Sequence, residues 1–336
     1  MCPKCSLIIS PLNVDMVKQN SCILPREFLN LFEYKIFSTD QLRLNTISVL
    51  NSCLSNENNF SISVLEDKKL KGYIIIEFMP YDSHIFEFNV YKISDFCFLG
   101  KNDSENSQII QIILDELKNK IDYLGIKYLI ISINANISIA SLFLNLLIKN
   151  SFYFINTLIT FKMEKGDYGR VKLSEPKDNK VKVREIGKED IGEIIEIAKN
   201  SYKIDRFHLD PNLDKNKCNL LYEQSAINSI SNGYADIVFV AEYNNKIVGY
   251  FSAKKHVNQV LGINFGIGLV SAVSENVRNM GVFSLMNNHI LEWCYYNTDI
   301  TELGTYITNI PVHRTFIYNR LNIIRGTYQL AFYNNR

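Results

Sequence analysis

Residues 264–294, NFGIGLVSAVSENVRNMGVFSLMNNHILEWC, combine an apolar strand, a short loop and an amphipathic helix. The predicted strand is apolar at Leu269, Val270, Ala272 and Val273, and the predicted loop consists of Arg278, Asn279, Met280, Gly281, Val282 and Phe283. The helix that follows has an apolar stripe at Leu285, Ile290, Leu291 and Trp293. A loop that opens directly into a helix leaves several backbone N–H groups unpaired and pointing one way. Together with the helix dipole, these groups predict an anion site suited to a pyrophosphate.

The composition is that of a globular protein, because 47% of the 336 residues are hydrophobic and 12% are aromatic. This length is enough for two domains, each with a core of its own. A net charge of +1 argues against a protein that coats nucleic acid. The chain has no run of about twenty apolar residues, so we expect no membrane-spanning helix.

The seven cysteines are scattered and odd in number. This pattern favours reduced thiols and a cytoplasmic protein over a disulfide framework. The first ten residues, MCPKCSLIIS, lack the apolar core and the cleavage site of a signal peptide. Cys2 and Cys5 form one CxxC pair, but no second pair follows at metal-ligand spacing, so we expect no metal site.

The two halves of the chain repeat one order of predicted elements. Each half has a strand hairpin whose second strand opens with Gly-Tyr, at residues 72–73 and at residues 249–250. A middle strand, a helix, a buried strand, a second helix and a closing strand follow in each half. A polar stretch with two glycines and a proline separates the halves. We therefore predict domains at residues 1–165 and 181–336, joined by a linker at 166–180.

The strand, loop and helix resemble the acyl-CoA-binding segment of the GNAT superfamily of N-acyltransferases. The loop of that family reads Gln or Arg, two residues, Gly, one residue, and Gly or Ala. Arg278 and Gly281 fit this pattern, and Phe283 departs from its final small residue. The resemblance implies an α/β (mixed α+β) fold of tandem GNAT-like domains, each a mixed, mostly antiparallel sheet flanked by helices. It also implies acyl-CoA as the co-substrate, bound by the strand and loop residues above together with Asn309.

The connection in the first half that corresponds to this loop is Phe98–Glu105. It is acidic and lacks the Arg-x-x-Gly pattern. Since an acidic loop repels a pyrophosphate, we interpret residues 1–165 as a degenerate GNAT-like domain. Residues 181–336 are then the catalytic domain that binds acyl-CoA.

Residues 202–211, YKIDRFHLDP, followed by Tyr222, resemble the acceptor region of GNAT enzymes that acylate nucleotide-linked amino sugars, of the dTDP-fucosamine type. Residues 81–86, YDSHIF, are similar to a Trp-Asp-Ser-x-Phe-Phe segment of the same group. The resemblance implies a dTDP-linked amino-6-deoxyhexose as the acceptor, made for a surface polysaccharide such as an O-antigen or a capsule. The residues implied to bind this acceptor are Arg206, Phe207, His208, Asp210 and Tyr222.

Acyl transfer from a thioester needs a polarised carbonyl, a deprotonated amine and a protonated leaving group. Backbone N–H groups of the strand at Leu269–Val273 are predicted to polarise the carbonyl. His208 is the candidate base because its intrinsic pKa is near the working range, although a histidine that only hydrogen-bonds its own backbone or the sugar fits equally well. Arg206 could pair with a diphosphate or cap a helix. Asp210 could orient His208 or start the turn at Pro211.

GNAT enzymes commonly place a general-acid tyrosine some residues after an asparagine that Asn309 resembles. An ungapped count from Asn309 puts Phe316 at that position, and a phenylalanine cannot donate a proton. An alignment anchored on residues 321–323 puts Tyr318 there, so Tyr318 is the candidate acid. A packing role on a helix explains Tyr318 equally well.

Acetyl-CoA is the default acyl donor of the family. Phe283 and residues 306–308 indicate an altered acyl pocket, which would suit a short acyl group such as 3-hydroxybutyryl. Two other functions stay open: acylation of a polyamine, an antibiotic or a protein N-terminus, and a catalytically silent module that binds CoA or a sugar nucleotide. We expect no nucleic-acid, membrane or metal partner, and a homodimer is an open alternative.

Overall fold

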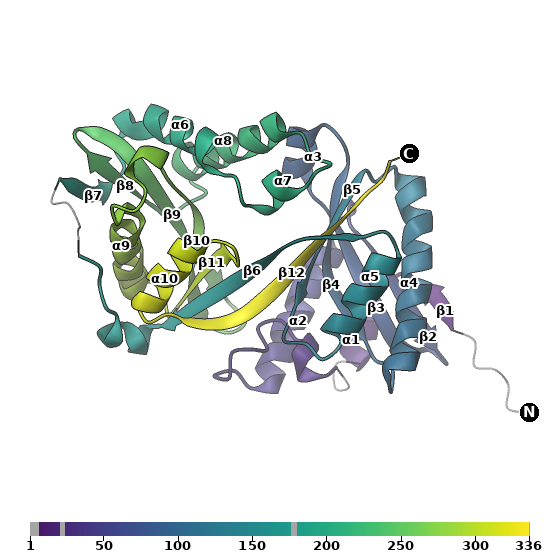
Figure 1. Ribbon diagram of the computed structural model, residues 1–336. Coiled ribbons are helices and arrows are strands. Elements are labelled where there is room, and N and C mark those ends of the chain that lie inside the picture. Colours follow the sequence, from purple (N-terminus) through teal and green to yellow (C-terminus); the bar gives the residue numbers. More distant parts are fainter. Residues whose placement is uncertain (1–6, 21–23, 176–179, 336) are drawn as a thin grey trace, which may run out of the picture. The chain divides into compact units, whose positions relative to one another are not determined.

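The computed structural model of the protein describes all residues except 1–6, 21–23, 176–179 and 336 (Figure 1). Cys2, Cys5 and part of the predicted linker therefore lie outside the described residues. The chain forms two compact units. Unit 1 contains residues 1–155 and 326–336, and unit 2 contains residues 156–325.

Unit 1 is built on a sheet with the strand order β1-β2-β3-β4-β5-β12. Its strands are β1 (Ile8–Ser10), β2 (Phe60–Glu66), β3 (Lys69–Phe78), β4 (Val90–Phe98), β5 (Tyr128–Asn134) and, from Gly326 onward, β12 (Asn322–Tyr333). Its helices are α1 (Val14–Asn20), α2 (Thr39–Leu54), α3 (Pro80–Phe86), α4 (Asp103–Leu124) and α5 (Ala140–Lys149). The pair β4–β5 is parallel, and the other pairs are antiparallel.

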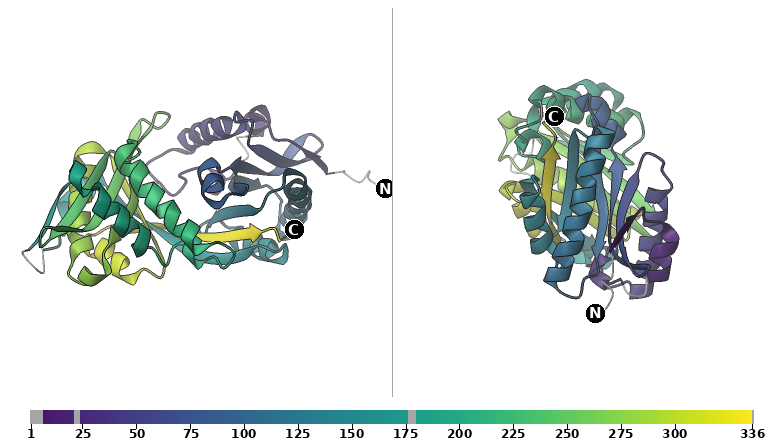
Figure 2. Two further views of the ribbon diagram at one scale, coloured as in Figure 1. Left: turned by 90° about the horizontal axis from the view of Figure 1, so that it is seen from above. Right: turned by 90° about the vertical axis from the view of Figure 1, so that its right-hand side faces the viewer.

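Helix α4 shows how local sequence sets an element of unit 1. The helix follows Asn102, whose side chain accepts a hydrogen bond from the third residue of α4, and it ends at Gly125 with a φ of 61°. In the right-hand view of Figure 2, α4 lies in front of the strands of unit 1. Gly72 of β3 permits this packing, because a Cβ there would lie 2.8 Å from Ile109 of α4.

Unit 2 is built on a sheet with the strand order β6-β11-β10-β9-β8-β7. Its strands are β6 (Tyr153–Glu164, from Asn156 onward), β7 (Val181–Glu185), β8 (Ile237–Tyr243), β9 (Lys246–Asn258), β10 (Ile263–Val273) and β11 (Ile300–Tyr306). Its helices are α6 (Ile191–Ser201), α7 (Arg206–Leu209), α8 (Lys215–Ser231), α9 (Val282–Asn297) and α10 (Ile310–Tyr318). The pair β10–β11 is parallel, and the other pairs are antiparallel.

Two hydrophobic cores lie on opposite faces of the sheet in unit 2. Phe251 of β9 belongs to the core of α9, whereas the preceding residue, Tyr250, belongs to the core of α6. Successive strand residues point to opposite faces, so α9 and α6 cover different faces. The predicted stripe of α9 is buried at Leu285, Ile290 and Leu291, and Trp293 is partly buried at its edge.

The two units share a pairing register as well as an order of elements. In unit 1, Gly72 of β3 pairs with Phe98 of β4, and in unit 2 the equivalent glycine, Gly249 of β9, pairs with Val273 of β10. Each unit also has one short parallel strand pair beside this hairpin. The repeated, mostly antiparallel sheets flanked by helices are those that the sequence predicted.

The closing strand of each half does not stay with the strands that precede it. Strand β6 follows α5 in sequence, yet its residues Leu158–Glu164 pair with β11 of unit 2. Strand β12 follows α10, yet its residues Thr327–Tyr333 pair with β5 of unit 1. The units of the structure therefore differ from the predicted division at 1–165, 166–180 and 181–336. In the predicted linker, the main chain of Ser174 exchanges hydrogen bonds of 3.1 and 2.8 Å with the side chain of Asn288 on α9.

Truncation of Ile290, a residue of α9, should destabilise unit 2, because its side chain is fully buried in the core between α9 and the sheet. We expect Ile290→Ala to lower the free energy of unfolding by about 2–5 kcal/mol. Ile317→Ala is the matched control: Ile317 is 58% exposed on α10, and its loss should cost less than about 0.5 kcal/mol. Trp293 is the only tryptophan of the chain, so its fluorescence during urea unfolding reports on unit 2. Equal losses in the two variants would contradict the assigned core.

Candidate active site

A divergence between two parallel strands marks the candidate active site. Strand β10 pairs with β11 over only three residues, Phe265–Ile267. Both strands then continue, β10 to Val273 and β11 to Tyr306. At Gly268, where the divergence begins, a Cβ would lie 2.7 Å from the side chain of Leu303, so glycine permits the last close approach. We call the space between residues 268–273 of β10 and 303–306 of β11 the wedge.

The residues predicted to polarise a carbonyl lie on the β10 side of the wedge. The register with β9 shifts between Gly268 and Ser271, so Leu269 and Val270 form a bulge. The buried hydroxyl of Ser252 holds this bulge: it accepts the Val270 N–H at 3.3 Å and donates to the Val270 carbonyl at 3.1 Å. Since N–H groups alternate in direction along a strand, some of those beyond Gly268 point away from β9 and toward the wedge. The remaining predicted residues, Ala272 and Val273, pair with Tyr250 and Gly249.

The predicted phosphate loop follows β10 directly. A single 3₁₀ turn at Glu275–Val277 leads to Asn279, with a φ of 69°, and to Gly281, with a φ of 83°. This left-handed conformation is readily adopted only by glycine and, less easily, by asparagine. Gly281 precedes α9 and has no side chain to cap it. The first N–H groups of α9, including those of Val282 and Phe283, therefore have no partner within the helix.

Three side chains of the loop, those of Arg278, Met280 and Phe283, contact other protein groups. The guanidinium of Arg278 lies 3.4 Å from the carboxylate of Glu275. Met280 packs against the core of α9. Phe283 stacks on Phe251 of β9, with 5.6 Å between the ring centroids. Phe283 is therefore a core residue here, and the anion donors that the loop offers are mainly backbone groups.

In unit 1 the corresponding loop is filled by its own side chains. The carboxylate of Glu105 accepts the Lys101 N–H at 2.8 Å and pairs with Lys71 at 2.5 Å. These hydrogen bonds, that of Lys71 foremost, lower the pKa of Glu105. The side chain of Asn106 accepts the Gly100 N–H at 2.7 Å. Because these backbone donors are already engaged, the contacts support the prediction that the first half is degenerate as a CoA-binding domain.

The predicted acceptor segment contains a helical turn that the sequence analysis missed. Helix α7 begins after Asp205, whose buried carboxylate accepts the N–H groups of Phe207 and His208 at 2.9 and 3.1 Å. The other carboxylate oxygen of Asp205 lies 2.5 Å from Nδ1 of His208. Asp205 therefore orients His208, in place of the predicted Asp210. An aspartate at this spacing is an N-cap signal, which could have identified it.

Both ring nitrogens of His208 are engaged. Nδ1 faces Asp205, and Nε2 lies 2.9 Å from the side-chain oxygen of Asn219 on α8. Burial alone lowers the pKa of His208, but the hydrogen bonds to Asp205 and Asn219 raise it more, and the net pKa lies above 6.5. A base needs an unprotonated nitrogen that faces the substrate. The contacts of His208 favour instead a structural role, in which it joins α7 to α8.

Arg206 and Asp210 have packing and turn contacts. The guanidinium of Arg206 lies over the ring of Phe207, 4.5 Å from its centroid. Asp210 is fully buried, and its carboxylate accepts the Asn212 N–H at 2.9 Å. This contact belongs to the turn at Pro211, which is the second of the two predicted roles of Asp210.

Three tyrosines connect the acceptor segment with the β10 side of the wedge. Tyr222 stacks on Tyr202, with 3.7 Å between the ring centroids. The hydroxyl of Tyr202 donates to the carbonyl of Ser271 at 2.9 Å and lies 3.2 Å from the hydroxyl of Tyr250. Burial raises the pKa of all three phenols, so they stay protonated at neutral pH. Only Tyr222 was predicted as a site residue.

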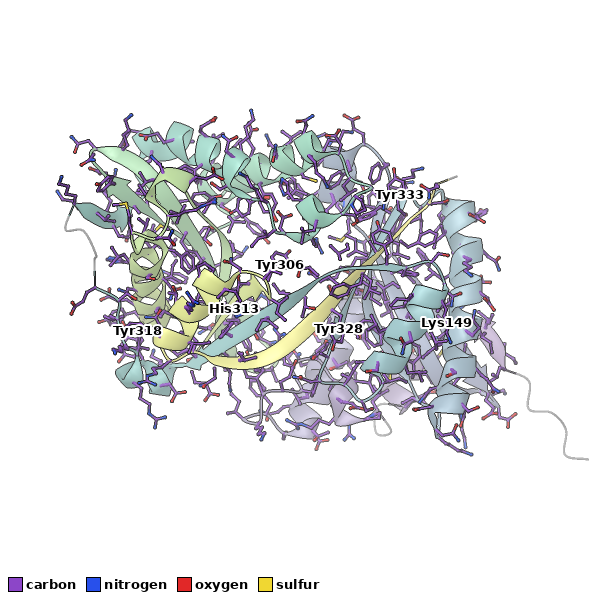
Figure 3. All side chains as sticks on the ribbon, in the orientation of Figure 1. Lys149, Tyr306, His313, Tyr318, Tyr328 and Tyr333 are labelled. Carbon is purple, nitrogen blue, oxygen red and sulfur yellow. The ribbon has the colours of Figure 1, made fainter. Side chains whose placement is uncertain are left out.

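Helix α10 places neither candidate acid at the wedge. Phe316 is fully buried against Phe283. Tyr318, the last residue of α10, is 42% exposed, and the ammonium of Lys172 lies 4.7 Å from its ring centroid. Figure 3 shows Tyr318 at the opposite end of α10 from Tyr306, where β11 ends. The predicted role of Tyr318 as general acid stays a prediction, and the position of Tyr318 argues against it.

The start of α10 holds the end of β11. The Asn309 N–H and Nε2 of His313 both donate to the carbonyl of Tyr306, at 2.8 and 3.0 Å. The side chain of Asn309 makes no capping hydrogen bond to α10. Its predicted part in binding acyl-CoA stays a prediction.

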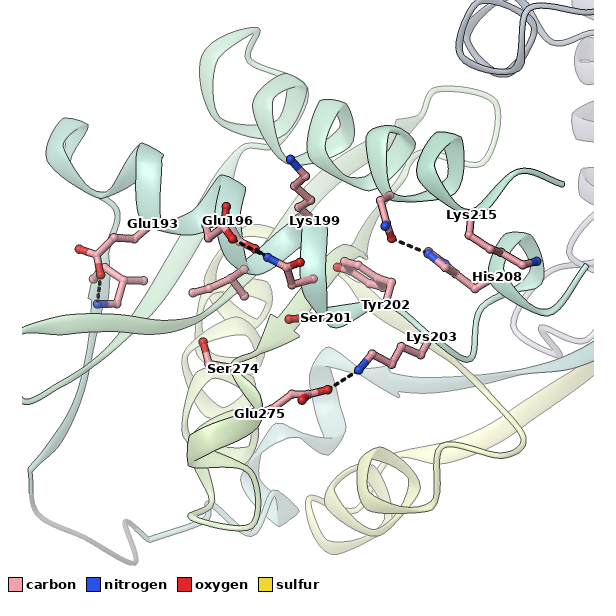
Figure 4. Close-up of a pocket in the computed structure, with 14 residues that line it drawn as sticks. Glu193, Glu196, Lys199, Ser201, Tyr202, Lys203, His208, Lys215, Ser274 and Glu275 are labelled. Atoms are coloured by element: carbon pink, nitrogen blue, oxygen red, sulfur yellow. Dashed lines mark hydrogen bonds and ion pairs between the residues drawn. The ribbon is translucent and has the colours of Figure 1, made fainter.

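A surface cleft of about 710 Å³ opens within unit 2 beside these groups (Figure 4). Tyr202 and His208 line it from the acceptor segment, and Glu275 lines it from the 3₁₀ turn that leads to the phosphate loop. Three lysines and three glutamates line the cleft: Lys199, Lys203, Lys215, Glu193, Glu196 and Glu275. The ammonium of Lys203 pairs with the carboxylate of Glu275 at 2.6 Å. The cleft therefore extends from the predicted acceptor segment to the residues just before the predicted loop, and its charged lining is mixed.

In the part of the chain that the structure describes, no group of three or more His, Cys, Asp or Glu side chains is placed to hold a metal ion. None of the described helices is both long and apolar enough to cross a membrane. The cytoplasmic location and the homodimer stay predictions.

The repeated sheets, the divergent parallel strands and the loop before α9 define the class of fold as that of tandem GCN5-related N-acetyltransferases (GNAT). No family model and no curated protein sequence matches the chain. Solved structures do match, at sequence identities that show the fold alone. They confirm the predicted fold class.

A GCN5-related N-acetyltransferase from Sphaerobacter thermophilus superposes with a TM-score of 0.62 at 10% identity, over 99% of this chain and 97% of that chain. A tandem GNAT protein from the clavulanic acid biosynthesis pathway superposes with a TM-score of 0.53 at 9% identity, over 98% of both chains. A glucosamine N-acetyltransferase region of a fungal multi-domain β-N-acetylglucosaminidase gives a TM-score of 0.65 at 9% identity, over 98% of this chain and 38% of that chain.

The loop before α9 can be tested through Gly281. We expect the wild-type chain to bind one CoA and Gly281→Val to lose this binding, because valine strains the left-handed backbone and crowds the donors. Asn279→Gly is the matched control: it keeps a positive φ in the same loop and should bind CoA normally. Isothermal calorimetry measures both variants, after Trp293 fluorescence has shown that they are folded. Undiminished CoA binding by folded Gly281→Val would remove this loop as the phosphate site.

The charge of His208 can be tested through Asp205. Because the folded pKa is raised above 6.5, protonated His208 stabilises the fold in full below about pH 6.5, and this stabilisation is lost as the pH rises through the folded pKa. We expect Asp205→Asn to move the NMR titration midpoint of His208 to lower pH. Glu275→Gln, an exposed change in the same cleft, should leave it in place. A wild-type midpoint at or below 6.5 would show that His208 is not held by Asp205.

Proposed function

We propose that this protein transfers an acyl group from acyl-CoA to a primary amine. The observation that carries the proposal is the wedge between β10 and β11 together with the uncapped start of α9 at its mouth. The wedge offers strand N–H groups to an extended ligand, and the helix start offers N–H groups and a dipole to a pyrophosphate. Acyl-CoA has both parts, so one molecule of it suits both features.

The chemistry needs no covalent intermediate with the protein. The amine nitrogen attacks the thioester carbon, and the carbon–sulfur bond then breaks. The bulge at Leu269 and Val270 sets the direction of the N–H groups that would polarise the carbonyl. Holding the amine close to the thioester then supplies much of the rate. Since both nitrogens of His208 are engaged, water is the simplest acceptor of the amine proton.

We propose a nucleotide-linked amino sugar, of the dTDP-amino-6-deoxyhexose type, as the acceptor. Its diphosphate would suit Lys199 and Lys215 of the cleft beside the acceptor segment, because ammonium groups pair with phosphate oxygens. A sugar amine is also the substrate class named for the fungal glucosamine N-acetyltransferase region. The acyl group in this proposal is acetyl or a short acyl group such as 3-hydroxybutyryl.

An activity screen tests the proposal. The purified chain is incubated with acetyl-CoA or 3-hydroxybutyryl-CoA and a panel of amines: dTDP- and UDP-linked amino sugars, glucosamine, spermidine and an N-terminal peptide. Release of free CoA thiol gives the rate, and mass spectrometry identifies the acylated amine. Transfer to a nucleotide sugar supports the full proposal, and transfer to another amine supports only the acyltransferase part. CoA binding without any transfer would mean a silent binding module.

A further inference from the structure

The acyl transfer proposed above leaves a thiolate, and a nearby proton donor lowers the barrier to its departure. Neither residue suggested by the spacing after Asn309 supplies this proton at the wedge. Phe316 has no acidic proton, and Tyr318 is an exposed residue at the far end of α10, under Lys172. The donor, if the protein supplies one, must come from a different element.

Tyr306 ends β11 on the wall of the wedge opposite the bulge. It lies four residues past Glu302, the last residue of β11 that pairs with β10. Leu303 of β11 is buried in the core of α9. Because strand residues alternate between faces, Tyr306 points to the opposite face, which carries α7. Figure 3 shows it beside the first turn of α10, away from Tyr318.

A series of tyrosines leads from Tyr306 to the β10 wall. The phenol of Tyr306 lies near enough to Tyr222 that ionisation of Tyr306 would raise the pKa of Tyr222, and Tyr222 stacks on Tyr202 with 3.7 Å between the ring centroids. The Tyr202 hydroxyl in turn donates to the Ser271 carbonyl of β10. These tyrosines therefore span the α7 face of the wedge from one strand to the other.

Tyr306 differs from the neighbouring tyrosines in the hydrogen bonding of its phenolic O–H. The proton of Tyr202 is donated to Ser271, and Tyr250 is fully buried behind it. The oxygen of Tyr306 instead accepts the main-chain N–H of Arg206. Its own O–H donates to no acceptor among the described residues and can therefore donate to a ligand. Burial raises the pKa of Tyr306, while the charge and the N–H of Arg206 oppose that rise; the phenol stays protonated at neutral pH, and these two contacts would stabilise its anion.

We propose that Tyr306 is the residue that protonates the departing thiolate, an assignment that rests on the proposed function. As the carbon–sulfur bond breaks, its electron pair passes to sulfur, and sulfur takes the phenolic proton of Tyr306. The tyrosinate that forms faces the Arg206 N–H and regains a proton from water that has accepted the amine proton. No oxidant, reductant or metal enters this balance.

The test compares Tyr306→Phe with Tyr318→Phe, two identical changes that remove one hydroxyl each. With acyl-CoA and an amine from the screen, we expect Tyr306→Phe to lower kcat by about a hundredfold or more. Its affinity for CoA, measured by calorimetry, should stay that of the wild type. Tyr318→Phe should keep kcat within about twofold, because Tyr318 is exposed and remote.

A second measurement separates proton donation from packing. Fluorotyrosine at position 306 has nearly the size of tyrosine but a more acidic phenol. If Tyr306 is the donor, the alkaline limb of kcat moves to lower pH as fluorine atoms are added, because the donor is lost at a lower pH. A packing role leaves the limb in place.

Two results overturn the assignment alone: kcat of Tyr306→Phe within about threefold of wild type, or an alkaline limb that does not follow the acidity of residue 306. A large loss in Tyr318→Phe with a normal Tyr306→Phe would transfer the role to Tyr318. A wild-type chain that binds CoA and acylates no amine overturns the proposed function, and this assignment with it.

Discussion

Hydrogen bonding between β10 and β11 stops after Ile267, and the candidate site is arranged around that limit. Backbone groups in a protein interior need partners wherever a neighbouring strand is missing. Side chains supply several of them here: the Ser252 hydroxyl at the bulge, the Tyr202 hydroxyl at Ser271, and His313 at the Tyr306 carbonyl. The ends of the two strands are therefore held apart by fixed contacts, and the space between them does not depend on a ligand to stay open.

The two units show how one backbone plan can have two chemical outcomes. Both have a parallel pair that is shorter than its strands, and both have a glycine at the same place in the preceding hairpin. They differ in the next loop. In unit 2 the loop ends at Gly281, which has no side chain, whereas in unit 1 Glu105 and Asn106 fold back onto the loop and occupy its donors. The two loops therefore differ in whether side chains occupy their backbone donors, and not in their fold.

Much of this architecture was readable from the sequence because it depends on local patterns. Period-two and helical spacing of apolar residues located most strands and helices, and the spacing of Arg278 and Gly281 located the loop before α9. The exchange of the closing strands was not readable, since β6 and β12 fit either sheet by pattern, and only long-range pairing decides between them. The contacts of individual site residues were not readable for a similar reason. Asp210 is nearer to His208 in sequence than Asp205 is, but the N-cap geometry of α7 brings Asp205 to the imidazole. Tyr318 was proposed from an alignment anchored on residues 321–323, yet its side chain is exposed at the end of α10.

The pairing of β12 with β5 has a consequence for how the chain is made. Residues 326–336 complete the sheet of unit 1, and a ribosome produces them only after all of residues 156–325. Until then β5 is an exposed edge strand, able to pair wrongly with other chains. The first unit to be synthesised is thus the last to be completed, and its folding must wait while about half of the chain emerges. A fragment that ends after β6 would carry this open edge permanently. Cutting the gene between the two halves would therefore yield an aggregation-prone N-terminal fragment, although the two repeats look independent in sequence.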